Sequence, residues 1–179
     1  MRDLIEAFAV QAARVGATVH RTAPAEGVPR IANVLAETSC RTAALASGLP
    51  NRATILEALR AEDVSEVAAA QLSPIRRADC GVSWAKLGVA ESGSVLLHAS
   101  SEDRRVELCV DVHVVWLAAS ALVPTLDEAF AALREISARP PAYVSLVSGP
   151  SSSADIERIL TVGVHGPKAL HIVLIGDAE

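Results

Sequence analysis

Hydrophobic positions in the first sixty residues switch between helical and strand-like spacing. Leu4, Phe8 and Ala12 recur at four-residue intervals and predict an amphipathic helix over residues 2–15, closed by Gly16. The pattern then predicts a strand over 17–22, a helix over 25–37, a strand over 42–46 and a helix that begins after Asn51. Helices that alternate with strands in this way are typical of a parallel sheet covered by helices.

The middle of the chain has longer apolar runs. Residues 88–98 predict an apolar segment, a tight polar turn over Glu91–Ser94 and a strand, and residues 106–117 predict a second long strand. We interpret the two strands as a β-hairpin, across which His98 and His113 face one another.

In the last fifty-five residues, helices and strands are again predicted to alternate. Thr125 and Glu128 have the spacing of a capping box at the start of a helix. The inner face of this helix is predicted to carry Leu126, Ala129, Phe130, Leu133 and Ile136. The pattern then predicts a strand over 142–148, a turn, a helix over 154–160 and a final strand over 169–175. Ser152 and Asp155 fit the S-x-x-D pattern that caps a helix.

Composition narrows the functional classes. The chain has 179 residues, 16 basic and 21 acidic side chains, a net charge of −5 and 3% aromatic residues. Nucleic-acid binding needs a basic footprint and usually stacking rings, so this class is excluded. The longest apolar-rich stretch, from Val114 to Pro124, is about half the roughly 20 residues that a membrane-spanning helix needs. We therefore expect no membrane span.

Cysteine and histidine usage limits the cofactors. The three cysteines, Cys40, Cys80 and Cys109, are odd in number and far apart in the sequence. They argue against a disulfide framework, against an iron–sulfur cluster held by this chain alone, and for a reducing cytoplasm. The five histidines include no H-x-x-x-H or H-E-x-x-H pattern, so no metal site is predicted.

One turn could bind an anion. The run Gly149-Pro150-Ser151-Ser152-Ser153 lies between a predicted strand and a predicted helix. Helix N–H groups and hydroxyls at a strand end bind phosphate or carboxylate in open α/β sheets. The alternative is that these residues only cap the helix.

Two other turns carry ionisable side chains. His165, in Val164–Lys168, is either a general acid or base or a group that holds the loop by bonding the backbone. Lys168 either neutralises an anion or is solvated. Glu91, between an apolar run and a glycine turn, is either a base or nucleophile or a solvated acid of a hairpin turn.

Four sequence blocks resemble the LUD-domain family, of the lactate utilization protein C type. They are Gly88-Val89-Ala90-Glu91-Ser92-Gly93-Ser94, Val123-Pro124-Thr125-Leu126, the run SGPSSSADIE from Ser148 to Glu157, and the run GVHGPKALH from Gly163 to His171. The blocks stand in the expected order within residues 81–175. One departure precedes His113, where the family often has a Leu-Pro-Pro run and this chain has no proline.

The resemblance implies an α/β fold of the NagB/RpiA/CoA-transferase-like type. This is a Rossmann-like sheet with helices on both faces, here with a β-hairpin insert. We interpret residues 1–179 as a single LUD-like α/β domain, with an N-terminal α/β portion over 1–80 and the family-motif portion over 81–176.

The resemblance also implies a function. Family members are linked to growth on L-lactate and act with two iron–sulfur partner proteins in oxidising lactate to pyruvate. It therefore implies that any cluster belongs to the partners and that this chain carries no cofactor. We expect a non-redox component that acts with those partners and binds a small anionic ligand. The alternative is a stand-alone transferase or isomerase for a phosphorylated or CoA-linked small molecule.

The three turns are expected to meet at one site, because turns at the carboxyl ends of strands converge in this type of sheet. The expected catalytic residues are Glu91 and His165. The expected ligand-binding residues are Ser92, Gly93, Ser94, Gly149, Pro150, Ser151, Ser152, Gly166 and Lys168.

Overall fold

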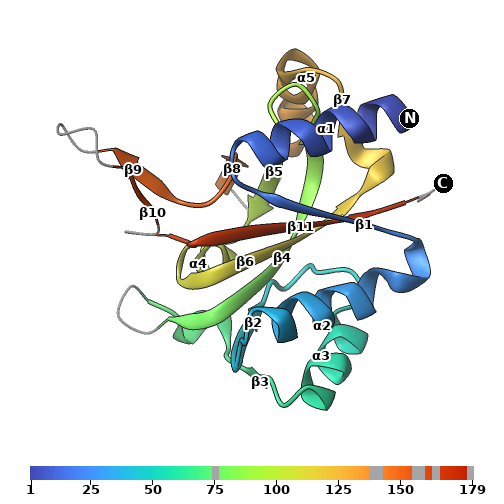
Figure 1. Ribbon diagram of the computed structural model, residues 1–179. Helices are drawn as coiled ribbons and strands as arrows, with labels where there is room; N and C mark the ends of the chain where they lie inside the picture. The colour runs from blue at the N-terminus through green and yellow to red at the C-terminus, as the bar shows by residue number, and fades with distance from the viewer. Residues whose placement is uncertain (74–76, 138–142, 155–159, 163–165, 177–179) are drawn as a thin grey trace.

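A computed structural model describes residues 1–73, 77–137, 143–154, 160–162 and 166–176. Figure 1 shows a central sheet with helices packed on both sides of it. The first portion of the chain forms α1 (Arg2–Arg14), β1 (Thr18–Thr22), η1 (Pro24–Glu26), α2 (Gly27–Glu37), β2 (Thr42–Leu45), α3 (Arg52–Ala61), β3 (Ser65–Glu66) and η2 (Ala69–Gln71). These elements confirm the helices and strands predicted for this portion.

The rest of the chain contributes the longer strands. Its elements are β4 (Ala78–Val89), β5 (Ser94–Ala99), α4 (Asp103–Leu108), β6 (Val110–Ala118), η3 (Ala119–Ala121), β7 (Leu122–Val123), α5 (Leu126–Ser137), β8 (Tyr143–Val147), β9 (Ser152–Ala154), β10 (Leu160–Val162) and β11 (Ala169–Ile175). Among them, α5 starts as predicted, because Glu128 N donates to Thr125 Oγ1 at 3.3 Å.

The main sheet has the strand order β1-β11-β6-β4-β2-β3, and each neighbouring pair in this order is parallel. Strands from the first portion of the chain therefore lie at both edges of this order, and strands from the second portion form its centre. This confirms the predicted α/β class with a mostly parallel central sheet.

Alternating side chains on the central strands fill a core on each face of the sheet. Val114 and Val173 pack with residues of α2 and α3 on one face. Val115 and Ile172 pack with α1 on the other face. Both faces are apolar because buried parallel strands need cover on two sides, which explains the large aliphatic fraction of the sequence.

The tight turn predicted over Glu91–Ser94 is confirmed, but the hairpin predicted between the strand that follows it and the strand over 106–117 is wrong. Strand β4 runs through the turn at 90–93 into β5, and the two strands are antiparallel. Strand β6 instead lies parallel to β4, so His113 is in register with Gly81 and Leu170. His98 is in register with Val144 of β8.

Helix α4 explains this error. It occupies the segment that the sequence assigns partly to a connection and partly to a strand. A helix of six residues is too short to show a helical period, and only Val106 and Glu107 within it are buried. The helix lies between β5 and β6, and β6 pairs with β4 and β11 and not with β5.

The predicted helix over 154–160 is wrong at both ends. Ala154 lies in β9 and Leu160 lies in β10, and these strands pair with each other as an antiparallel ribbon. Ser152 belongs to β9, so it does not cap a helix. The capping partner Asp155 lies outside the described residues. Figure 1 shows the ribbon projecting from the body of the sheet.

Two side-chain expectations are also wrong. Phe130 was assigned to the inner face of α5, but it is 56% exposed, whereas Ala129 is 2% exposed. Cys40 and Cys80 are joined by a disulfide, with their Cα atoms 6.1 Å apart. Sequence distance hid this pairing, because Cys40 precedes β2 and Cys80 lies in the adjacent strand β4. Within the described residues, no helix is long and apolar enough to cross a bilayer.

Candidate functional site

Two of the three turns lie against one another. Ser151 N donates to the carbonyl oxygen of Pro167 at 2.8 Å, which joins the Gly149 turn to the loop before β11. Gly149 has a φ of +79°, and a Cβ at this position would overlap the carbonyl oxygen of Val15. Only glycine tolerates this backbone and this approach to the end of α1. The loop that contains Gly166 enters the amino end of β11, whereas the Gly149 turn follows the carboxyl end of β8.

These turns border a cavity of about 390 Å³. It lies between α4, β8 and the start of β6 and β11. We refer to it as the Glu107 cavity, and its lining comprises Glu107, Leu108, His113, Ser145, Leu146, Val147, Ser148, Gly149, Ser151, Gly166, Pro167 and Leu170. Small-molecule sites have volumes of about 300–1,000 Å³ and mix apolar walls with a few polar groups, as this one does.

Glu107 is the ionisable acid of the cavity. Its side chain comes from the last turn of α4 and is only 6% exposed. Burial raises its pKa from 4.5 to about 7, Arg104 opposes that shift and Asp103 adds to it. Within the described residues, the side chain of Glu107 takes part in no hydrogen bond or salt bridge. Its carboxyl group therefore changes charge near neutral pH inside the cavity.

His113 provides a neutral imidazole. It is 1% exposed, and its Nε2 lies 2.8 Å from Ser83 Oγ. Complete burial lowers the pKa of His113 to about 4, so the ring is uncharged at neutral pH. A hydroxyl partner satisfies one nitrogen of this ring, which explains how a polar side chain is accommodated beneath the cavity.

A chain of serine hydroxyls connects the third turn to the cavity. Ser92 Oγ lies 2.8 Å from Ser94 Oγ, and Ser94 Oγ lies 2.6 Å from Ser148 Oγ. Ser94 is fully buried, whereas Ser148 lines the cavity. The Glu91–Ser94 turn is therefore linked to the cavity through Ser148 and does not itself line it. Gly93 lies so close to α1 that a Cβ would overlap the backbone of Ala12.

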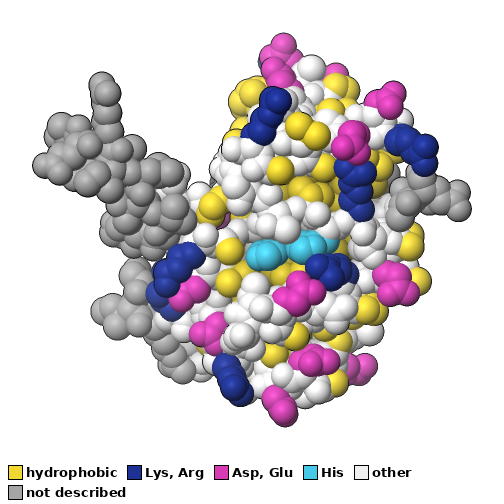
Figure 2. All heavy atoms as spheres, in the orientation of Figure 1, with side chains coloured by type: hydrophobic (Ala, Val, Ile, Leu, Met, Phe, Trp, Pro, Cys, Tyr) yellow, Lys and Arg dark blue, Asp and Glu magenta, His cyan; other side chains and the backbone are white. Residues whose placement is uncertain are grey.

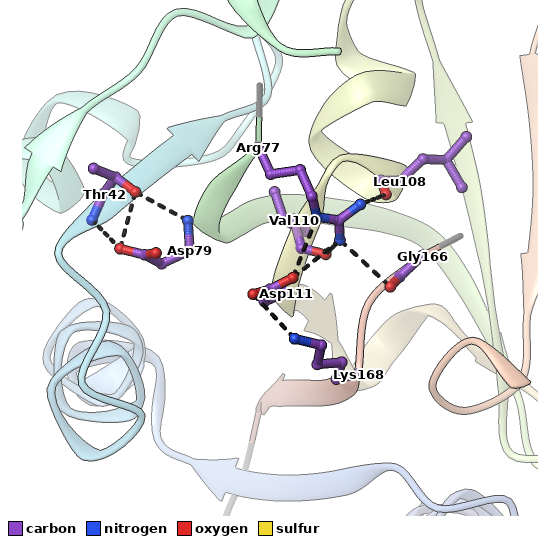
Figure 3. A network of polar contacts seen from close by, with 8 residues as sticks. All are labelled: Thr42, Arg77, Asp79, Leu108, Val110, Asp111, Gly166 and Lys168. Atoms are coloured by element: carbon purple, nitrogen blue, oxygen red, sulfur yellow. Dashed lines mark hydrogen bonds and ion pairs between the residues drawn. The ribbon is translucent and has the colours of Figure 1, made fainter. Parts of the chain in front are cut away.

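An arginine-centred network fixes the loop that closes one side of the cavity (Figure 3). Arg77 donates to the carbonyl oxygens of Leu108, at 3.4 Å, and Gly166, at 3.4 Å, and to the carbonyl oxygen of Val110. It also pairs with Asp111 at 3.2 Å. These contacts tie the end of α4 to the loop before β11.

Lys168 belongs to the same network. Its Nζ lies 3.4 Å from Asp111 Oδ2, and its backbone N donates to the carbonyl oxygen of Asp111 at 2.7 Å. The ammonium group therefore has an acidic partner, Asp111, as Figure 3 shows. Lys168 does not line the Glu107 cavity.

Glu91 has a structural partner. Its Oε2 accepts a hydrogen bond from Leu126 N at 2.9 Å, at the first turn of α5. The carboxylate is exposed and lies outside the cavity lining. Its proposed catalytic companion His165 lies outside the described residues, so the pair is not brought together by anything described here. Pro150 and Ser152 are described but do not line the cavity.

A second polar cluster lies on the α2 side of the sheet. Figure 2 shows two histidine side chains next to each other at the surface, near basic and acidic groups. The rings of His20 and His171 stack, with centroids 5.3 Å apart. Arg30 Nη2 donates to His20 Nδ1 at 2.8 Å, so His20 Nε2 carries the proton that is shared with His171 Nδ1 at 3.0 Å. Burial, then Arg30 and His171, lower the pKa of His20 to about 4.

No metal centre is formed by the part of the chain that the structure describes. It contains no group of three or more His, Cys, Asp or Glu side chains that could hold an ion. In the histidine pair, His20 is instead hydrogen-bonded to Arg30, which also forms a salt bridge with Glu37 at 3.3 Å.

Glu107 is the site residue that sequence reasoning missed. It stands in a charged stretch, between Arg105 and Leu108, and nothing in its neighbours marks it as buried. The available signal was Val106 and Cys109, which are three residues apart and pack in the same small core. Helical spacing of these two residues would have predicted α4, but not the direction in which Glu107 points.

A match to a family model shows the family to which this chain belongs. The model of the LUD domain matches residues 5–175, which is nearly the whole chain. The chain belongs to the LUD-domain family. The matching stretch includes every lining residue of the Glu107 cavity.

Curated relatives of this LUD-domain chain carry the name lactate utilization protein C. The protein from Anoxybacillus flavithermus is 39% identical over 100 residues, which are 55% of this chain and 44% of that protein. The protein from Shouchella clausii is 40% identical over 101 residues, which are 54% of this chain and 44% of that protein. The chain thus spans about half the length of the curated relatives it matches.

A solved structure shares the fold. The crystal structure of a DUF162 family protein from Deinococcus radiodurans aligns with a TM-score of 0.73 over 98% of each chain. The sequences are 20% identical, so the likeness concerns the fold alone.

Proposed function

We propose that this chain is a non-redox component of an L-lactate utilisation system. In this proposal it acts in the cytoplasm with iron–sulfur partner proteins, which carry the electrons from lactate as pyruvate forms. The chain itself binds a small ligand in the Glu107 cavity. The observation that carries the proposal is the 39% identity with a lactate utilization protein C.

The position of the cavity supports the link between sequence and function. Two of the blocks that resemble the family supply its Gly149 turn and its Gly166 loop. A third block, which contains Ser94, reaches the cavity lining through Ser148. Blocks that are far apart in the chain thus meet around one space that can hold a small molecule.

The cysteines support the non-redox role. An iron–sulfur cluster is held by thiolates, usually four of them. This chain has three cysteines, of which Cys40 and Cys80 are joined to each other and Cys109 is buried. Electron transfer is therefore assigned to the partners.

Growth on defined carbon sources tests the proposal. A strain that lacks the gene for this chain is expected to grow on pyruvate and to fail on L-lactate, because only the oxidation of lactate is interrupted. Expression of the intact chain is expected to restore growth on L-lactate. Normal growth of the deletion strain on L-lactate, with no second gene of this family present, would overturn the proposed function.

Reconstitution from purified proteins tests whether the iron–sulfur partners, and not this chain, carry out the oxidation of lactate. L-lactate-dependent reduction of a dye by the purified iron–sulfur proteins is expected to rise when this chain is added, while the chain alone gives no reduction. Turnover of L-lactate by the isolated chain would contradict the non-redox role.

A further inference from the structure

The Glu107 cavity has an unusual charge pattern for a site that takes an anion. The described residues that line it include the Glu107 carboxyl group and no lysine or arginine. The sequence predicts a small anionic ligand, and the acid named in the proposed function, L-lactate, is ionised at neutral pH. Two carboxylates in one buried space repel each other strongly, and such pairs are held together by one shared proton.

The remaining polar groups of the lining are neutral. Ser148 and Ser151 have hydroxyls that can donate to a carboxylate, and the buried His113 ring is engaged by Ser83 at Nε2. Neutral donors can orient an acid, but they do not cancel its charge. The charge balance of the cavity therefore depends on Glu107 itself, whose side chain is 6% exposed.

We infer that the Glu107 cavity binds a small hydroxycarboxylic acid together with one proton, which Glu107 shares with the carboxylate of the ligand. The choice of acid rests on the proposed function. The protonated carboxyl group donates to the ligand carboxylate, and a hydrogen bond between an acid and its anion is among the strong ones in proteins. Since burial raises the pKa of Glu107 to about 7, the proton is available near neutral pH.

The charged groups around Glu107 leave this balance intact. On α4, Arg104 lowers the pKa of Glu107 and Asp103 raises it. From β6, the side chain of His113 is neutral, and Asp111 is paired with Arg77 and Lys168.

Among the described residues, the charged groups of the other elements that contact α4 have partners of their own. Lys86 of β4 lies over the Trp84 ring, with its Nζ 3.9 Å from the ring centroid. On β4, Asp79 accepts hydrogen bonds from Arg41 N, at 2.9 Å, and from Thr42 N, at 2.8 Å. Strand β2 and η2 have no ionisable side chains. Glu107 is thus left as the group that titrates within the cavity.

Calorimetric titration of the full chain with L-lactate tests the inference. The affinity is expected to be about tenfold higher at pH 6 than at pH 8, because binding takes up a proton that free Glu107 has released at the higher pH. At pH 8, titrations in buffers of different ionisation enthalpy are expected to report uptake of nearly one proton per ligand.

Two matched variants test whether Glu107 is the group that takes up the proton. Glu107→Gln keeps a donor and removes the charge, so it is expected to bind L-lactate with little dependence on pH and more tightly than the native chain at pH 8. Glu57→Gln removes the same charge from an exposed position on α3, and it is expected to retain the native pH dependence.

Three results would overturn the inference: an affinity that does not change with pH, an affinity that rises with pH, or no binding of L-lactate at pH 6. Failure here is separable from failure of the proposed function. A strain that needs the chain for growth on L-lactate, together with a chain that does not bind L-lactate, would refute the cavity and retain the function.

Discussion

Glu107 is the residue that determines the charge of the cavity. It is buried and lines the same cavity as a neutral histidine, and the described lining residues include no lysine or arginine. Burial penalises the charge of a carboxyl group and favours its protonated form, and at Glu107 this effect is larger than the opposing effect of Arg104. The same property that tunes the cavity also affects the stability of the folded chain.

Replacement of Glu107 by glutamine is expected to stabilise the protein at high pH. The pKa is about 7 in the folded state and near 4.5 when exposed. The folded state therefore holds the proton more tightly, and its stability falls as the pH rises from about 4.5 to 7. Glu107→Gln removes this loss, which is at most about 3 kcal/mol at pH 8.

Thermal unfolding at two pH values checks this expectation. The melting temperature of Glu107→Gln is expected to exceed that of the native chain at pH 8 and to approach it at pH 5. The Glu57→Gln variant serves as the control. An equal difference at both pH values would show that Glu107 does not titrate in the folded state as described.

At the scale of elements, helices of several turns and long strands could be predicted from the sequence, and short elements could not. The helices α1, α2 and α5 carry apolar stripes over three turns or more, and the sequence predicted them. Helix α4 has six residues and β9 has three, so neither shows a period. The Ser152 and Asp155 pattern predicted a cap because polar residues at this spacing also occur in turns.

The candidate site, too, could be predicted from the sequence only in part. The sequence predicted the Gly149 turn and the Gly166 loop as neighbours, and the structure brings them together. It placed Glu91 with them, because strand ends often converge, but the side chain lies at the first turn of α5. The pairing of β4 with β7 brings Glu91 to the start of α5, and no local pattern contains that information.

The start of α5 gives a prediction at this scale. Glu91 accepts a hydrogen bond from Leu126 N, one of the free N–H groups at the first turn of the helix. Glu91→Ala is expected to lower the free energy of unfolding by about 0.5–2 kcal/mol, as loss of a capping group does. Binding of L-lactate by this variant is expected to stay native, which calorimetry at pH 6 would measure.

A different result would restore the catalytic hypothesis for Glu91. If Glu91→Ala unfolds at the native temperature but loses ligand binding or function, its carboxylate acts on a ligand and not on α5. Glu128→Ala on the same helix is the control, because its side chain is exposed and only its backbone N takes part in the cap.

At the scale of the molecule, the sheet joins segments that are distant in the sequence. Strand β1 from the start of the chain pairs with β11 from its end, and β2 pairs with β4. The Cys40–Cys80 disulfide links the segment just before β2 covalently to β4. The cavity is built in the same way, from α4, β6, β8 and the loop before β11, so its integrity depends on the whole fold.

Counting thiols checks the covalent link. The unfolded protein without reductant is expected to take up one alkyl group, at Cys109, and the reduced protein is expected to take up three. Mass spectrometry of the alkylated chain distinguishes these states. Three alkyl groups without reductant would show that Cys40 and Cys80 are thiols in the purified protein.

The central claim is that the Glu107 cavity carries the role of this chain in lactate utilisation. Ser145→Phe would fill the cavity from β8, and Ser65→Phe makes the same change at an exposed position on β3. The decisive measurement is growth of the deletion strain on L-lactate when either variant is expressed at a matched level of folded protein. We expect Ser65→Phe to restore growth and Ser145→Phe to fail on L-lactate while growing on pyruvate. Full growth of the Ser145→Phe strain on L-lactate would contradict the account.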